Sequence, residues 1–550
     1  MSDFIDMLKK QGDQLFDKRS PLLALWQEIA ENFYPERADF TTDRSITAGM
    51  ADNLTTSYPI IARRDLGNAF SAMLRPSQKP WFNVRSQRPD KDTTLGKQWL
   101  EWLTGFDRNL MYDNRSQFIR ATKEGDHDFA TFGQCVISTE MNPTRSGLLF
   151  RCWHLRDVVW VEDATGAIGT IHRTWDPTAQ DLMDLFPKTC SQKVKDAATK
   201  DPFRTFKVRH VVMATEHAQR YDASERVQGI RQPYVSVYFE HATGEVLELV
   251  GAWTQHYTIA RWQTVSGSQY AHSPAVVAAL PDARLLQQIT AVLLEAGEKA
   301  VTPPMIGVQE ALRGDVSVYA GGITWVDAAY DERLGEVLRP VTQDKSGIQF
   351  GLEIQRDVRA QLAEAFYLSK LNLPPVDGTQ MTAYEVGQRV QEFIRNTLPL
   401  FEPMEANYNG VLCDHVTTLA IHNTPEVMQS IPEELRGQSL DYTFESPLRE
   451  AIEKIKVGQY MEANQVLSVA IQADPTVALL VDNKKATRDV LGAVIPAAWI
   501  RSEGDVEKAA AQQQQQVQAQ QLLGMMQQGA DVAKTINEAT PTAGVGGAAL

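Results

Sequence analysis

The sequence PDARLLQQITAVLLEAGEKAVTPP, residues 281–304, predicts the long helix around which the rest of the fold is organised. Its apolar side chains recur at helical spacing and share one face. They are Leu285, Ile289, Val292, Leu293 and Ala296. Pro303-Pro304 ends the helix, because proline lacks the amide that a further turn requires. About 20 residues at ~1.5 Å each make a rod roughly 30 Å long.

A second long helix is predicted within residues 341–371, with Ile354, Val358, Leu362 and Ala365 on one face. Residues 305–340 lie between the two helices and predict a compact strand-and-turn insertion. Residues 372–380, NLPPVDGTQ, predict a loop, because prolines stop the preceding helix. Thr382-Ala383-Tyr384-Glu385 is a capping box that opens the next helix.

On the N-terminal side, residues 1–133 predict helices and residues 134–280 predict strands. After Gly133, segments rich in Val, Ile, Trp and Thr are separated by tight turns, so mainly antiparallel pairing is expected. The expected strands are 134–140, 148–155, 157–162, 167–175, 207–215, 233–240, 246–253 and 257–264, with short helices near 177–200. The predicted fold class is therefore α+β.

The C-terminal part returns to helical patterns. Residues 381–472 predict helices with one strand-like piece at 440–445. Residues 473–539 predict a further helical region, although its glutamine- and alanine-rich portion offers few bulky apolar side chains for packing. Residues 540–550, TPTAGVGGAAL, are predicted to be disordered.

Composition restricts the function. The 550 residues can bury a large core, and the formal net charge of −15 argues against tight DNA binding through a basic patch. It does not exclude a surface past which DNA slides. The four scattered cysteines predict reduced, buried thiols. The N-terminus lacks a signal-peptide pattern, and no apolar run approaches membrane-spanning length, so we expect a protein made in a cytoplasm.

No catalytic motif is evident: there is no phosphate-binding loop, nucleophile elbow or zinc-protease helix. Adjacent helical residues point about 100° apart, so Asp126-His127-Asp128 predicts a solvated face rather than a metal site. Cys413-Asp414-His415 predicts packing and surface positions for the same reason. Trp99 and Trp102 predict core or interface packing, and Lys79-Pro80-Trp81-Phe82 a packed loop. We expect no enzyme activity, cofactor or metal.

Five segments, taken in order, carry a family resemblance. They are Trp26 through Tyr34-Pro35, Ala62-Arg63-Arg64 through Leu74-Arg75-Pro76 with Pro80-Trp81, Phe118 through Phe132-Gly133, Asp163-Ala164-Thr165-Gly166, and Met381-Thr382-Ala383-Tyr384-Glu385-Val386. Over about residues 15–500 this set resembles the head-to-tail connector (portal) family of short-tailed bacteriophages. The last segment is similar to the signal that opens the helix after that family's channel loop.

The resemblance implies a structural ring, dodecameric in that family, around a DNA channel. It implies a wing formed by 1–133, 134–280 and 381–472, and stem helices at 281–304 and 341–371. It further implies a clip at 305–340, a channel loop at 372–380 and a crown at 473–539. The implied partners are further copies of the chain, non-specifically bound double-stranded DNA, the large terminase, the major capsid protein or scaffold, and tail adaptors, with no membrane. The implied location is the virion, assembled in the host bacterial cytoplasm.

The candidate DNA-channel residues are Lys345, Lys370, Asn372, Leu373, Pro374, Pro375, Val376 and Asp377. Two interpretations of the lysines remain open. In the first, both side chains lie in solvent or pair with Asp344 and Glu364. In the second, the lysines form sparse cationic rings that slow DNA slippage. Two other functions also remain open: a packaging enzyme, or another virion component such as a tail adaptor.

Overall fold

The computed structural model describes residues 2–42, 52, 54–77, 80–87, 94–142, 144–307, 312, 338–340, 346–368, 404–444, 460–461, 463–468, 486–487, 490 and 506. The chain divides into two compact units. The first comprises Met1–Asn83, Leu103–Ser430 and Tyr442–Leu448, and the second Val84–Trp102, Ile431–Asp441 and Arg449–Leu550. The elements discussed below belong to the first unit, with four exceptions. Phe82–Ser86, Thr94–Met111 and Leu440–Phe444 each have residues in both units, and Glu433–Leu435 lies in the second.

The N-terminal part is helical, as predicted, with one exception. Its helices are α1 (Ser2–Lys18), α2 (Ser20–Phe33), α3 (Tyr58–Leu74), α4 (Thr94–Met111) and α5 (Phe118–Phe132), with a 3-10 turn at Pro35–Arg37. The exception is strand β1 (Phe82–Ser86), parts of which fall in each unit. Phe82 and Val84 are buried while Arg85 is exposed, which is the period-two pattern of a strand. Trp81 is fully buried, so the predicted packing of this segment is confirmed.

Residues 134–261 form two antiparallel sheets, and every predicted strand of this region is present. One sheet has the order β3 (Leu148–Trp153), β2 (Gln134–Met141), β9 (Tyr257–Arg261). The other runs β4 (Val158–Glu162), β5 (Ile168–Trp175), β6 (Val208–Ala214), β7 (Tyr234–Glu240), β8 (Val246–Ala252). Sequential strands lie side by side in the second sheet. Tight turns join β4 to β5 and β7 to β8, whereas short helices lie in the connections from β5 to β6 and from β6 to β7. The mixture of helices and antiparallel sheets confirms the α+β class.

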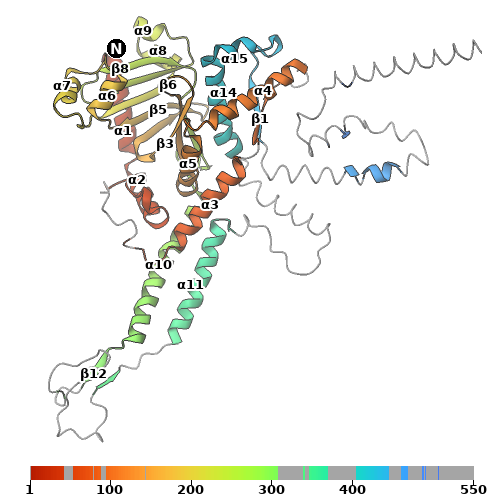
Figure 1. The fold of residues 1–550 in the computed structure, drawn as a ribbon. Helices are drawn as coiled ribbons and strands as arrows, with labels where there is room; N and C mark the ends of the chain where they lie inside the picture. Colours follow the sequence, from red (N-terminus) through yellow and green to blue (C-terminus); the bar gives the residue numbers. More distant parts are fainter. Residues whose placement is uncertain are drawn as a thin grey trace, which may run out of the picture. The chain divides into compact units, whose positions relative to one another are not determined.

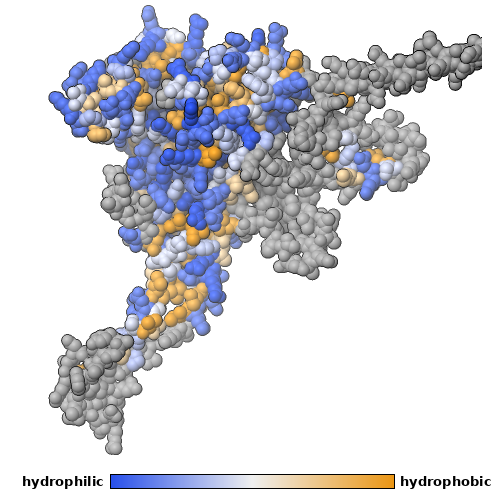
Figure 2. All heavy atoms as spheres, in the orientation of Figure 1, coloured by the Kyte–Doolittle hydropathy of each residue, from blue (hydrophilic) through white to orange (hydrophobic). Residues whose placement is uncertain are grey.

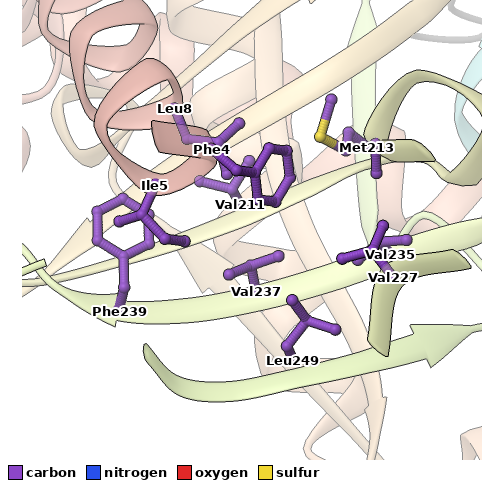
Figure 3. Close-up of a cluster of buried hydrophobic side chains, with 11 residues drawn as sticks. Phe4, Ile5, Leu8, Val211, Met213, Val227, Val235, Val237, Phe239 and Leu249 are labelled. Atoms are coloured by element: carbon purple, nitrogen blue, oxygen red, sulfur yellow. The ribbon is translucent and has the colours of Figure 1, made fainter. Parts of the chain in front are cut away.

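Helix α1 packs on the five-stranded sheet (Figure 3). Phe4, Ile5 and Leu8 lie on one side of the helix, because residues four apart share a face. Their partners are Val211, Met213, Ala218, Val227, Val235, Val237, Phe239 and Leu249. A second cluster forms where α6 (Ala179–Leu185) and α7 (Gln192–Lys200) pack against Val208 and Leu247. These clusters form the core of the strand-rich part.

The next elements complete the description outside residues 274–368 and 404–410. They are α8 (Thr215–Tyr221), α9 (Glu225–Gln228), β10 (Gln263–Thr264), β11 (Ala271–His272), α14 (Val411–Asn423), α15 (Pro425–Ser430) and β14 (Leu440–Phe444), with 3-10 turns at Leu155–Asp157 and Glu433–Leu435. Strand β14 confirms the predicted strand-like piece. Cys413 and His415 are buried while Asp414 is exposed, as predicted for packing and surface positions. Residues 540–550, predicted to be disordered, lie outside the described residues, as does most of 473–539.

Candidate functional site: the stem helices and their base

Helix α10, which the sequence predicts to be the first stem helix, spans Pro274–Val301 rather than beginning at Pro281. The name stem helices is kept for α10 and its partner helix as the name of that prediction. Ser273 caps it, because its side-chain oxygen accepts a hydrogen bond from the Val276 amide at 3.4 Å. Pro274 follows at the first helical turn, where its missing amide is not needed. Pro281 lies inside the helix with its ring exposed to solvent. The predicted helix start at Pro281 was therefore wrong, because this proline lies inside the helix.

The second stem helix, α11, spans Ser346–Ala365 and packs along α10 (Figure 1). Gly351 permits a close approach: a β-carbon there would lie 2.8 Å from Leu293 Cδ2. Gln355 donates a hydrogen bond across the pair to Thr290 at 2.9 Å. Beyond the helix ends, β12 (Met305–Gly307) and β13 (Leu338–Pro340) pair antiparallel. The predicted insertion 305–340 therefore begins and ends in adjacent strands.

Much of the apolar surface of the stem helices is exposed within one subunit. The buried residues of α10 end at Leu286, although the helix continues to Val301. Val292 and Leu294 on α10 are 63% and 57% exposed, and Phe350 on α11 is 65% exposed. Figure 2 shows hydrophobic side chains along both helices. Such surface is typical of an interface that another molecule covers.

By length and hydropathy alone, α10 is apolar enough to cross a membrane, with 22% of its most apolar window buried. The expectation that no segment approaches this length was therefore wrong. One such helix is weak evidence for a membrane segment. Because α10 packs along a second helix that carries charges at regular intervals, contact with protein explains the apolar surface equally well.

The charges of the stem helices nearly balance. Helix α10 carries three acidic residues (Asp282, Glu295, Glu298) and two basic ones (Arg284, Lys299). Helix α11 likewise carries Glu353, Asp357 and Glu364 against Arg356 and Arg359. The described helices thus have a small negative net charge. A surface of this kind does not hold a phosphate backbone tightly.

Hydrogen bonds fix the base of the stem to the chain before α3. The amides of Thr55 and Thr56 donate to Gln287 Oε1 at 2.8 and 3.0 Å. The Gln287 amide nitrogen donates in turn to the Thr56 carbonyl at 3.1 Å. Arg284 donates to Glu28 of α2 at 2.6 Å. Helix α10 is therefore held on two sides at its midpoint.

A column of aromatic rings joins the chain before residue 369 to the chain after residue 403. Tyr367 follows α11 with a left-handed φ of 58°, and its ring lies 6.5 Å from that of Trp262. Trp262 stacks on Phe129 at 5.4 Å, and Phe129 stacks on Tyr408 at 5.7 Å. Tyr408 lies in a π-helical turn, Glu405–Gly410. Both ends of the intervening segment are thus anchored on α5.

The aromatic column ends at Tyr408, beside a buried ion pair between Arg75 and Asp126. The prediction that Asp126-His127-Asp128 forms a solvated face was wrong. Asp126 and Asp128 are fully buried rather than solvated. Asp126 binds Arg75, which also donates to Asn409 at 2.6 Å. Asp128 accepts two hydrogen bonds from Arg37, at 3.0 and 2.7 Å. Burial disfavours the charge of Arg75, but the adjacent carboxylate raises the pKa of Arg75 above its ordinary value. Among the described residues no cluster suits a metal ion.

The eight predicted channel residues lie outside the described residues. They are Lys345, Lys370, Asn372, Leu373, Pro374, Pro375, Val376 and Asp377. Two arginines of α11 were not among the predicted channel residues. Arg356 is exposed, and Arg359 lies 5.8 Å from the centre of the Tyr58 ring. Their helical spacing from Ile354 and Val358 is the signal that could have placed them on the stem.

The sequence is similar to known proteins along nearly its whole length. The sequence matches the family described as "Bacteriophage head to tail connecting protein" over residues 6–497. It is 26% identical over 543 residues to a "Probable portal protein" of Bordetella phage BPP-1, covering 96% of this chain and 94% of that protein. It is 21% identical to the "Portal protein" of Salmonella phage epsilon15, covering 97% and 95%.

A solved structure described as "Virion of native gene transfer agent (GTA) particle" aligns with 80% of this chain and 90% of its own chain, at 11% identity and a TM-score of 0.35. The family match spans both stem helices, the aromatic column and the sheets. The chain therefore belongs to the bacteriophage head to tail connecting protein family.

Proposed function

We propose that the chain is the subunit of a portal ring that joins the phage head to the tail and forms a channel for DNA packaging and ejection. Both curated relatives are portal proteins, and each aligns along nearly its whole length. The observation that carries the proposal is the uncovered apolar surface of the stem helices, including Val292 and Phe350. A neighbouring copy of the same chain would cover it.

A ring requires a head-to-tail contact, in which one surface of the subunit meets a different surface of the next copy. The stem helices offer two such surfaces, one on α10 and one on α11. Their weakly acidic composition suits a channel, because each cationic contact with DNA would gain affinity by counterion release and slow the duplex.

The finer assignments are part of the same proposal. We expect twelve copies in the ring, residues 305–340 as the clip, and residues 372–380 as a loop that projects into the channel. We expect the large terminase, the major capsid protein or scaffold, and tail adaptors to bind the ring, and assembly to occur in the host cytoplasm. The family resemblance and the order of the elements support these assignments.

The test is the oligomeric state of a stem variant. Val292→Glu places a charge in the exposed apolar surface of α10, and Gln288→Glu places the same charge at a polar exposed position one turn earlier. We expect native mass spectrometry to show closed rings for the unmodified protein and for Gln288→Glu. Val292→Glu should remain folded by circular dichroism but mostly unassembled. Only monomers or dimers of the unmodified protein, at all concentrations and salts, would refute the ring.

A further inference from the structure

A groove of about 410 Å³ lies beside the outer strand of the three-stranded sheet. One wall comes from α5 and the residue before it, and includes Gln117, Arg120 and Glu124. The other comes from β3 and includes Arg151 and Trp153. The groove uses no residue of the stem helices, on which the proposed ring contact rests.

The backbone of β3 has an edge with no neighbouring strand among the described residues, because the sheet order is β3-β2-β9. The Thr139 amide of β2 donates to His256 on the β9 side at 2.8 Å, so the facing residue Phe150 directs its amide away from β2. The Phe150 amide indeed donates to Ser116 at 2.8 Å, on the outer side. Since these groups alternate along a strand, Cys152 also directs its N–H and C=O to the outer edge.

Each side of the β3 edge carries a positively charged side chain, Arg120 on one side and Arg151 on the other. Helix α5 covers the side to which Phe150 points, since the Phe118 and Phe150 rings lie 5.0 Å apart. Arg120 projects from that helix, and its ion pair is with Glu124 at 3.0 Å, between two exposed side chains. Arg151 is exposed on the other side, next to Trp153.

An added strand alternates its side chains between the two sides of a sheet. In this groove, side chains on one side of the added strand would meet Arg120, and those on the other side would meet Arg151. Trp153 and Trp175 add apolar contact area on one side. Two arginines against one glutamate make the groove cationic in a chain whose net charge is −15, so charge complementarity favours an acidic occupant.

We propose that this groove binds an extended acidic segment of another protein, which pairs with the outer edge of β3 as an additional strand. Backbone hydrogen bonds to Cys152 would give affinity, and the two arginines would select acidic side chains. This interaction uses neither stem helix.

The test measures binding of a fluorescein-labelled octapeptide, in which glutamate alternates with valine and threonine, to the full-length protein by fluorescence anisotropy. Arg151→Glu and Arg120→Glu should each weaken binding by about tenfold. Arg226→Glu, at an exposed position on α9, is the matched control and should leave binding unchanged. The same peptide with lysine in place of glutamate should not bind.

A second comparison tests the backbone contacts without altering the protein. The octapeptide N-methylated at its four central amides keeps every side chain but loses the donors for strand pairing, so its binding should be lost. Equal binding of the methylated peptide would overturn the proposal, as would equal weakening by Arg226→Glu. Displacement of the peptide by a single-stranded oligonucleotide would assign the groove to nucleic acid instead, and no binding at millimolar peptide would also overturn the proposal.

Discussion

Arg75 and Asp126 show what a single residue contributes to this protein. Their side chains are 2% and 0% exposed, so neither charge can be solvated if the other is removed. We expect Asp126→Asn to lower the free energy of unfolding by roughly 3–5 kcal/mol, because it leaves Arg75 buried and unpaired. The control, Asp65→Asn, removes the partner of Arg64 in an exposed pair and should cost less than about 1 kcal/mol. Urea denaturation measures the free energy of unfolding of both variants. Similar losses in Asp126→Asn and Asp65→Asn would contradict the buried ion pair.

Asp107 is the residue for which a pH effect is expected. Burial raises the pKa of its carboxyl to about 7, although the Thr417 hydroxyl, which donates at 2.6 Å, opposes the rise. The unfolded chain ionises near pH 4, so between about pH 4 and 7 only the unfolded state loses this proton, and stability falls as pH rises. The full effect is roughly 4 kcal/mol and is constant above pH 7.

Asp107→Asn should therefore stabilise the protein, and by more at pH 8 than at pH 5. The asparagine oxygen can still accept from Thr417, so the substitution changes the charge and leaves the hydrogen bond. Thermal unfolding midpoints of the two proteins at both pH values provide the measurement. If the difference in unfolding midpoint between the two proteins is the same at both pH values, Asp107 is not protonated in the native state.

At the scale of single elements, two glycines of the stem offer a matched pair. A methyl group at Gly351 would meet Leu293 at 2.8 Å, whereas at Gly297 it would meet nothing within 4 Å. Both alanine substitutions gain about 1 kcal/mol of helix propensity. Gly297→Ala should therefore slow amide hydrogen exchange in α10, and Gly351→Ala should show a smaller gain or a loss. Equal protection in the two variants would contradict the close packing at Gly351.

Elements whose signals are local were predictable from the sequence. The strands from Gln134 to Arg261 were found because alternation and tight turns are encoded in adjacent residues. The start of α10 was misplaced because two prolines compete there, and only the cap at Ser273 identifies the true one. The burial of Asp126 and Asp128 was missed because their partners lie 51 and 91 positions away. The groove beside β3 was missed because strand order is not a local property.

At the scale of the whole molecule, the proposed ring makes a prediction for the channel residues. Cyclic symmetry would repeat Lys345 and Lys370 as rings of positive charge. If these rings slow DNA slippage, Lys345→Ala and Lys370→Ala should assemble normally but lose DNA from filled heads, more so at low salt. Unchanged DNA retention at every salt concentration would leave the solvated interpretation of both lysines.

The predicted channel loop, residues 372–380, gives a second prediction for the assembled ring. Deleting three residues within 372–380 should leave rings intact by electron microscopy while impairing DNA packaging or retention, because local signals bound the loop on both sides. A deletion of the same length in 540–550 is the control and should affect neither. Failure of the loop-shortened protein to fold would show that the segment belongs to the core.

The aromatic column has a mechanical consequence. Residues 369–403 leave and rejoin the described chain at Tyr367 and Tyr408, which are joined by only two further rings, Trp262 and Phe129. A force that pulls on the intervening segment therefore reaches both anchors at once and is borne by α5 and the Arg75–Asp126 pair behind it. Because Tyr367 directly follows α11, the same tension would also reach the contact between α10 and α11, so the aromatic column links the load on the stem helices to the core around α5.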